Sequence, residues 1–145
     1  MDNIIVVGCD GSRAAHAALE WATTQAERTE SELLVVYVAS SIAEWELAAV
    51  QIDPDPIRRE FRHRLEGEWT ASVRKAQVPY QTRFAVGRVA EQLMHAARDV
   101  EATLIVIGLT PHGTLSELVM GTTQHELLRH AVRPVVAVPA TWAHP

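Results

Sequence analysis

Glycine and threonine residues between positions 103 and 122 form the clearest candidate for a phosphate-binding segment. A β-branched apolar run opens this stretch, and Gly108 stands where the run ends. Gly121 and Thr122 stand where an amphipathic segment begins. Glycine lets a backbone approach a phosphate closely, and a helix N-terminus offers free N–H groups to an anion. The pattern therefore favours phosphate binding, although glycines at strand ends also simply make turns.

A carboxylate and an imidazole are placed to complete such a site. Asp10 follows the apolar run at residues 4–7 and is a candidate contact for a ribose, a base or a phosphate-bound metal ion. His112 lies in the loop between Gly108 and Gly121, where it would come near a phosphate. Asp10, Gly11 and Ser12 also fit a plain turn followed by a helix cap. Cys9 is interpreted as a small buried hydrophobe.

Other nucleotide motifs and dedicated catalytic sites find little support. The chain contains no Walker sequence and no G-x-G-x-x-G after its first apolar run. The seven histidines show no metal-ligand spacing on one helix face. No nucleophile–base pair or carboxylate pair is visible, so a dedicated enzyme is the least favoured class. At most, slow ATP hydrolysis through water and a bound metal ion is expected.

The elements that would carry these residues alternate along the chain. Strands are predicted at residues 4–7, 33–38, 80–86, 103–107 and 134–139. Helices are predicted from Ser12 to about Glu30, from Asp55 to about Ala76, from Val89 to Val100 and after Gly121, while residues 40–54 show only a weak pattern. Alternating strands and helices indicate an α/β fold with a mostly parallel sheet and helices on both faces. Asp10, Val38 and Gly108 would then share the carboxyl edge of the sheet, where such folds bind ligands.

The bulk properties predict one cytoplasmic domain spanning residues 1–145. The formal net charge is −5 and Lys75 is the only lysine, which argues against nucleic acid or a membrane as partner. Cys9 is the only cysteine, so no internal disulfide is possible. No run is long enough for a signal peptide or a membrane span. The apolar segment from Pro134 to Pro139 reads as an edge strand that pairs with a second copy.

The chain resembles the universal stress protein family over nearly its whole length. The resemblance rests on IIVVGCDGSRAAHAALEWA at the start, VGRVAEQLMHAA at the start of the third helix, TLIVIG, and RPVVAVP at the end. ATP-binding members carry a glycine, two residues, a glycine, nine residues, and then glycine with serine or threonine. Gly108 matches the first position and Gly121–Thr122 the last, while Pro111 replaces the second glycine. Proline lacks a backbone N–H, and one lost charge-assisted hydrogen bond costs about 1.5–3 kcal/mol.

The resemblance implies a five-stranded parallel sheet of order 3-2-1-4-5, of the adenine nucleotide alpha hydrolase-like type, in a homodimer built through the last strand. It also implies that Asp10 lies by the ribose or base, that the backbone of Val38 meets adenine, and that the loop holds the phosphates of ATP, often with Mg or Mn. The candidate nucleotide site comprises Gly8, Cys9, Asp10, Val38, Ile107, Gly108, Thr110, Pro111, His112, Gly113, Gly121, Thr122 and Thr123. The alternative, motivated by Pro111, is a stress protein that binds no nucleotide and acts as a dimeric protein-interaction module.

Overall fold

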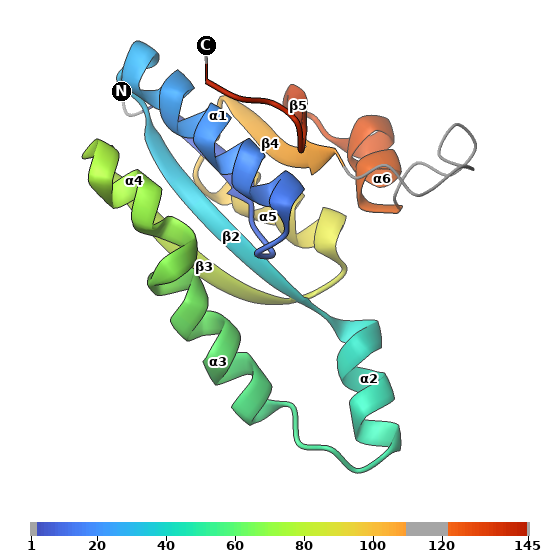
Figure 1. Ribbon diagram of the computed structural model, residues 1–145. Coiled ribbons are helices and arrows are strands. Elements are labelled where there is room, and N and C mark those ends of the chain that lie inside the picture. Colours follow the sequence, from blue (N-terminus) through green and yellow to red (C-terminus); the bar gives the residue numbers. More distant parts are fainter. Residues whose placement is uncertain (1–2, 110–121, 145) are drawn as a thin grey trace.

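The computed structural model describes residues 3–109 and 122–144, which form a five-stranded parallel sheet with helices on both faces (Figure 1). The strand order is β3-β2-β1-β4-β5, as predicted. The strands are β1 (Ile4–Gly8), β2 (Glu32–Ser40), β3 (Tyr80–Gly87), β4 (Leu104–Leu109) and β5 (Val135–Pro139). Two strands, β3 and β5, form the edges of the sheet.

The three central strands are apolar because both of their faces are covered. Val6 of β1 pairs with Leu34 of β2 on one side and with Ile105 of β4 on the other, and all three side chains are buried. A strand buried on both faces loses the apolar–polar alternation of a half-exposed strand. This is why continuous apolar runs in the sequence located β1, β2 and β4 correctly.

Helices divide the core into two clusters, one on each face of the sheet (Figure 1). On one face α1 (Arg13–Thr29) packs with α3 (Asp55–Glu66) and α4 (Ala71–Ala76). On the other face α5 (Val89–Asp99) packs with α6 (Thr122–His130). The N-cap of α1 is Ser12, as predicted, and its hydroxyl accepts the Ala15 N–H at 3.1 Å.

The predicted single helix from Asp55 to Ala76 is wrong in its middle. The structure ends α3 at Glu66, continues with a 3-10 turn, η1 (Glu68–Thr70), and then starts α4. Gly67 lies at the break with φ −109° and ψ −99°, far from helical values. Glycine costs a helix interior about 1 kcal/mol relative to alanine, so the chain bends there most readily. Asp55 is the first helical residue, and its N–H donates to the side chain of Asp53 at 3.0 Å.

The weakly patterned residues 40–54 contain a helix that the sequence did not indicate, α2 (Ser41–Ala49). No residue of α2 is buried, and Trp45 is 79% exposed. The half-buried Glu44 forms a two-pronged ion pair with Arg58 of α3. This pair fastens α2 to α3, and a charged contact leaves no apolar periodicity in the sequence.

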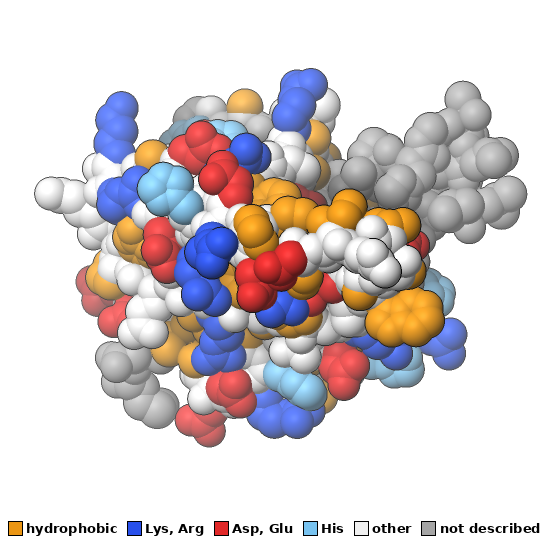
Figure 2. Space-filling model, turned by 90° about the horizontal axis from the view of Figure 1, so that it is seen from below, with side chains coloured by type: hydrophobic (Ala, Val, Ile, Leu, Met, Phe, Trp, Pro, Cys, Tyr) orange, Lys and Arg blue, Asp and Glu red, His pale blue; other side chains and the backbone are white. Residues whose placement is uncertain are grey.

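The face of the molecule seen from below the view of Figure 1 carries charges of both signs. Figure 2 shows acidic and basic side chains interspersed on this face, with apolar side chains exposed between them. A face of this kind lacks the single-signed field of an anion-binding surface. Among the described residues, no helix is both long and apolar enough to cross a membrane.

Candidate functional site

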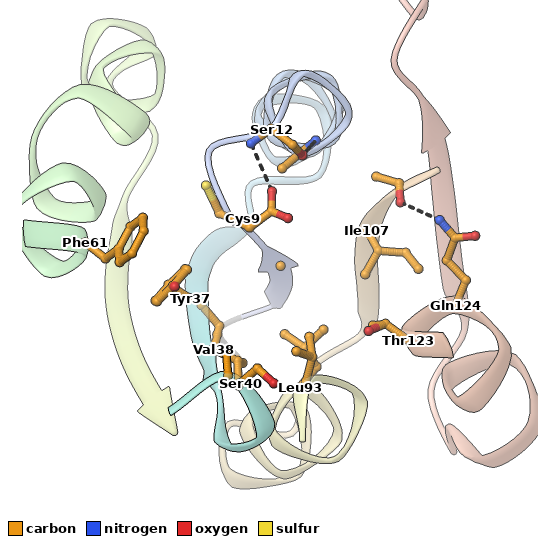
Figure 3. Close-up of a pocket in the computed structure, with 17 residues that line it drawn as sticks. Cys9, Ser12, Tyr37, Val38, Ser40, Phe61, Leu93, Ile107, Thr123 and Gln124 are labelled. Carbon is orange, nitrogen blue, oxygen red and sulfur yellow. Dashed lines mark hydrogen bonds between the residues drawn. The ribbon is translucent and has the colours of Figure 1, made fainter. Parts of the chain in front are cut away.

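A cavity of about 460 Å³ opens at the carboxyl edge of the sheet, where β1, β2 and β4 end (Figure 3). In Figure 3, Tyr37 and Phe61 stand on one side of it and Thr123 and Gln124 on the other. Ligands of doubly wound sheets bind at this edge. The described residues that line the cavity are Gly8, Cys9, Asp10, Ser12, Ala15, Val36, Tyr37, Val38, Ser40, Ala43, Phe61, Val89, Leu93, Ile107, Gly108, Thr123 and Gln124.

The turn at residues 10–12, called the 10–12 turn below, presents the charged group of this cavity. Asp10 is exposed, and its Oδ1 accepts the Ser12 N–H at 3.0 Å (Figure 3). Gly11 adopts a φ of +81°, a conformation that favours glycine. The turn thus carries a carboxylate held from its own backbone, with one oxygen engaged and the other available to a ligand hydroxyl, amine or cation.

Cys9 is buried at the base of the cavity, in agreement with its interpretation as a small hydrophobe. Its side chain is 5% exposed, and its N–H donates to Val36 O at 2.9 Å. Burial raises the pKa of the Cys9 thiol from 9.0 to about 11, and the Asp10 charge adds to this effect. The thiol is therefore protonated at neutral pH and is a poor nucleophile.

Gly108 is required by packing at the point where β4 approaches α1. A Cβ on Gly108 would lie 2.5 Å from the carbonyl carbon of Ala14 and 2.7 Å from its Cβ. The Gly108 carbonyl accepts the side-chain N–H of Gln124 at 3.0 Å (Figure 3). Gln124 is 6% exposed, so this bond ties the start of α6 to the end of β4 inside the molecule. Close packing against α1 therefore explains a glycine at position 108, independently of any ligand.

Val38 presents its backbone to the cavity. The strand β1 ends at Gly8, which pairs with Val36. Alternate residues of a strand direct their N–H and C=O groups toward the same neighbour, so those of Val38 point past the end of β1. A flat heteroaromatic ring placed there could exchange hydrogen bonds with this peptide edge, against the apolar side chains of Leu93 and Ile107.

Aromatic rings form the opposite wall. Tyr37 and Phe61 are stacked, with ring centroids 5.2 Å apart and an interplanar angle of 20°. Burial raises the pKa of Tyr37, and the charges of Asp10 and Glu44 raise it further. The phenol therefore stays neutral at physiological pH and offers a hydrogen-bond donor.

The structure brings together seven of the predicted site residues. These are Gly8, Cys9, Asp10, Val38, Ile107, Gly108 and Thr123. Thr122 is the first residue of α6. The remaining predicted positions, Thr110, Pro111, His112, Gly113 and Gly121, lie outside the described residues.

Several lining residues were not predicted as site residues. The aromatic pair is one case, since α3 brings Phe61 to Tyr37 from far along the chain. Gln124 is another case, because in the sequence it is indistinguishable from an ordinary residue on one face of a helix. A signal existed for Gln124, namely a polar residue within an apolar helix stripe close to Gly121 and Thr122.

The described lining is mainly apolar, and Asp10 is the only acidic or basic residue in it. No group of three or more histidine, cysteine or acidic residues capable of holding a metal ion occurs in residues 3–109 and 122–144. The described part of the site therefore suits the uncharged part of a ligand, with Asp10 for a hydroxyl group. A metal ion there would need oxygen ligands from the bound molecule itself.

Comparison with known proteins identifies the family. The model of the universal stress protein family matches residues 1–139. The chain belongs to this family. A curated universal stress protein of Mycobacterium bovis is 27% identical over 93% of the chain, and the chain spans about half (47%) of that relative's length. A Bacillus subtilis universal stress protein, 24% identical, is covered over 99% of its length.

Solved universal stress proteins share the fold. A crystal structure from Burkholderia pseudomallei is 32% identical, with a TM-score of 0.71 and coverage of 94% of this chain and 96% of the other. A family protein of Arabidopsis thaliana with AMP bound is 17% identical, with a TM-score of 0.66 and coverage of 94% and 91%. Two further structures with the same fold are complexes with cAMP and with dAMP.

Proposed function

We propose that this universal stress protein is a cytoplasmic regulatory protein that binds an adenine nucleotide at the carboxyl edge of its sheet. The observation that carries the proposal is the cavity of about 460 Å³ that joins Asp10, Val38 and the start of α6. The AMP, cAMP and dAMP complexes of proteins with this fold support the ligand class.

The proposal assigns a role to each part of the cavity. The adenine ring lies along the backbone of Val38 between Leu93 and Ile107, which exclude water from its faces. The carboxylate of Asp10 accepts a hydrogen bond from a ribose hydroxyl. The phosphates lie toward the N-terminus of α6 at Thr122 and Thr123, where the helix dipole favours negative charge. A Cβ on Gly8 would point toward Leu93 and Ile107, so this glycine leaves room for a ligand between them.

ATP together with Mg or Mn is one adenine nucleotide that the site could bind. When bound, the metal ion would neutralise the phosphate charge, and the carboxylate of Asp10 in the cavity lining would help to hold it. The lining residues fit the nucleoside portion best, and a monophosphate places the least uncompensated charge near Asp10. We therefore expect AMP to be bound without added metal.

Calorimetric titration of the purified protein with AMP, and with ATP plus magnesium, tests the proposal. Mass spectrometry of the protein under native conditions, as it comes from cells, reports any ligand carried through purification. Asp10→Asn is expected to weaken AMP binding, while Asp99→Asn, on an exposed carboxylate of α5 away from the cavity, serves as the control. The absence of heat with either nucleotide, together with a ligand-free mass, would reject the proposed function.

Pro111 motivates a second candidate function, a dimeric protein-interaction module that binds no nucleotide. The Pro111→Gly variant separates the two. A wild-type protein without affinity and a variant that binds ATP would favour the interaction module. Equal binding by both proteins would show that the proline is harmless.

We also propose a homodimer through β5. This strand forms one edge of the sheet, and it is flanked by Pro134 and ends at Pro139. An apolar edge strand is prone to pairing with another strand. Val132, next to it, is 93% exposed, which supports an apolar contact on this side.

A further inference from the structure

Trp69 touches the 10–12 turn without lining the nucleotide cavity. A Cβ on Gly11 would lie 2.5 Å from Cζ2, 2.6 Å from Cε2 and 2.9 Å from Nε1 of Trp69. The indole therefore lies directly against the Gly11 backbone, in space that any other residue would fill. Because Gly11 also has a φ of +81°, the turn depends on glycine for its conformation and on Trp69 for its cover.

The same indole supports the aromatic wall of the cavity. Its ring centroid lies 5.7 Å from that of Tyr37 and 6.0 Å from that of Phe61. Trp69 also lines a second hollow, of about 590 Å³, together with the 10–12 turn, residues of α1 and the chain after β5. Trp69 thus stands behind both the acidic turn and the aromatic wall.

The 3-10 turn η1 holds Trp69 in place through a set of hydrogen bonds. The buried Thr70 hydroxyl donates to Leu65 O at 2.8 Å. The guanidinium of Arg74 donates to the Thr70 hydroxyl at 2.8 Å, to Tyr80 Oη at 3.0 Å and to the carbonyl of Gly67. Five donors in a fixed fork suit this junction, because one side chain satisfies several acceptors at once.

We infer that Trp69 is a positioning residue of the nucleotide site and acts through Asp10. The inference rests on the function proposed above. Asp10 reaches the cavity only as the 10–12 turn directs it, and the indole is the side chain that covers this turn at Gly11. A smaller ring at position 69 leaves space over Gly11, so the turn and its carboxylate sample other positions and the ribose contact weakens.

The test compares two matched tryptophan substitutions. Trp69→Phe and Trp21→Phe both shorten a half-buried tryptophan packed against the same core cluster, but Trp21 has no contact with the 10–12 turn among the described interactions. AMP affinity is measured by calorimetry, and unfolding by urea, for both variants. We expect Trp69→Phe to weaken AMP binding about fivefold to tenfold and Trp21→Phe to leave it unchanged.

A double-mutant cycle distinguishes positioning from a merely structural role. In the Asp10→Ala background, Trp69→Phe should cause no further loss of AMP affinity, since the group that it positions is absent. A loss of the same size in both backgrounds, or equal affinities for Trp69→Phe and Trp21→Phe, would overturn the inference. A wild-type protein without AMP affinity would instead overturn the proposed function and this inference with it.

Fluorescence gives a readout that leaves Trp69 intact. In a protein with Trp21, Trp45 and Trp142 replaced by phenylalanine, the emission comes from Trp69 alone. We expect AMP to shift this emission, because the ligand engages the carboxylate of the turn against which the indole packs. An emission unchanged at saturating AMP would count against coupling between Trp69 and the site.

Discussion

Gly108 lies so close to α1 that the contact itself excludes a side chain. Alanine there would place its Cβ 2.5–2.7 Å from atoms of Ala14, most of them backbone. We expect Gly108→Ala to lower the free energy of unfolding by about 1–3 kcal/mol, as is typical of overpacking. Urea unfolding followed by circular dichroism measures this change.

Gly8→Ala provides the matched control for that substitution. A Cβ on Gly8 would meet only side-chain atoms of Leu93 and Ile107, at 3.3–3.6 Å. Flexible side chains yield more easily than a backbone, so the loss should be clearly smaller. Equal losses at the two positions would mean that β4 and α1 separate more readily than their packing indicates.

The Cys9 thiol makes stability depend on alkaline pH. Its pKa is raised to about 11 by burial, from 9.0 in an exposed thiol, so the unfolded chain ionises first. Below pH 9 the protonated thiol makes its full contribution to the free energy of unfolding. This contribution, about 2–3 kcal/mol, is lost as the pH rises from 9 to 11. Comparing urea unfolding of the wild type and Cys9→Ala at pH 8 and pH 10.5 isolates this contribution.

The two proteins should respond differently over that interval. The stability of the wild type should fall more steeply than that of Cys9→Ala, because other groups titrate equally in both. Parallel losses would show that the thiol is open to solvent. At pH 8, alkylation should also be much faster in urea than in the folded protein.

At the level of elements, α2 depends on a charged contact rather than on a buried face. Arg58 lowers the pKa of Glu44 through their hydrogen bonds, so the pair is present above the usual pKa of 4.5 and is lost as the pH falls below it. We expect Glu44→Gln to speed hydrogen exchange of the α2 amides while leaving the sheet unaffected. Hydrogen exchange read by mass spectrometry of peptides covering residues 41–49 measures the effect.

Glu46→Gln is the control on the same helix. Glu46 is exposed and forms no ion pair within the described part of the chain, so removal of its charge should leave the exchange of α2 unchanged. Equal acceleration by both substitutions would mean that net charge, rather than the Glu44–Arg58 pair, stabilises α2.

The difference between strands and helices explains what the sequence predicts here. Apolar runs such as residues 4–7 and 33–38 are buried on both faces, so burial alone locates them. The helix α2 and the break at Gly67 were missed because one rests on a pair between Glu44 and Arg58 and the other on a single backbone conformation. Neither feature produces a hydrophobic periodicity that can be recognised in the sequence.

The same distinction applies to the candidate site. Asp10, Val38 and Gly108 were placed on one edge because parallel strands end together, and the structure agrees. Tyr37 and Phe61 meet only after α3 folds back onto β2, and this tertiary contact has no local signature. The sequence therefore predicts which residues lie at the strand ends, but not which side chains form the walls of the cavity.

For the whole molecule, the proposed dimer makes an assembly-level prediction. Ala137 is exposed on the edge strand β5, so Ala137→Glu should place two like charges near the symmetry axis and yield a monomer. Sedimentation velocity at micromolar concentration measures the mass. Ala48→Glu, on an exposed position of α2, carries the same charge elsewhere and should remain dimeric.

A wild-type protein that sediments as a monomer would reject the β5 dimer. If both glutamate variants stay dimeric, the interface lies on another surface. In either case the nucleotide cavity remains available for testing, because its described lining contains no residue of β5.

The contact between Gly108 and Ala14 affects how nucleotide binding can be inferred from the sequences of related proteins. A paralogue that has lost its nucleotide would still be selected to keep this glycine, since the helix would otherwise be pushed off the sheet. Counting conserved loop glycines therefore overstates how many such paralogues bind ligand. Residues that are not needed for packing, such as the exposed Asp10, should distinguish better between relatives that bind a ligand and relatives that do not.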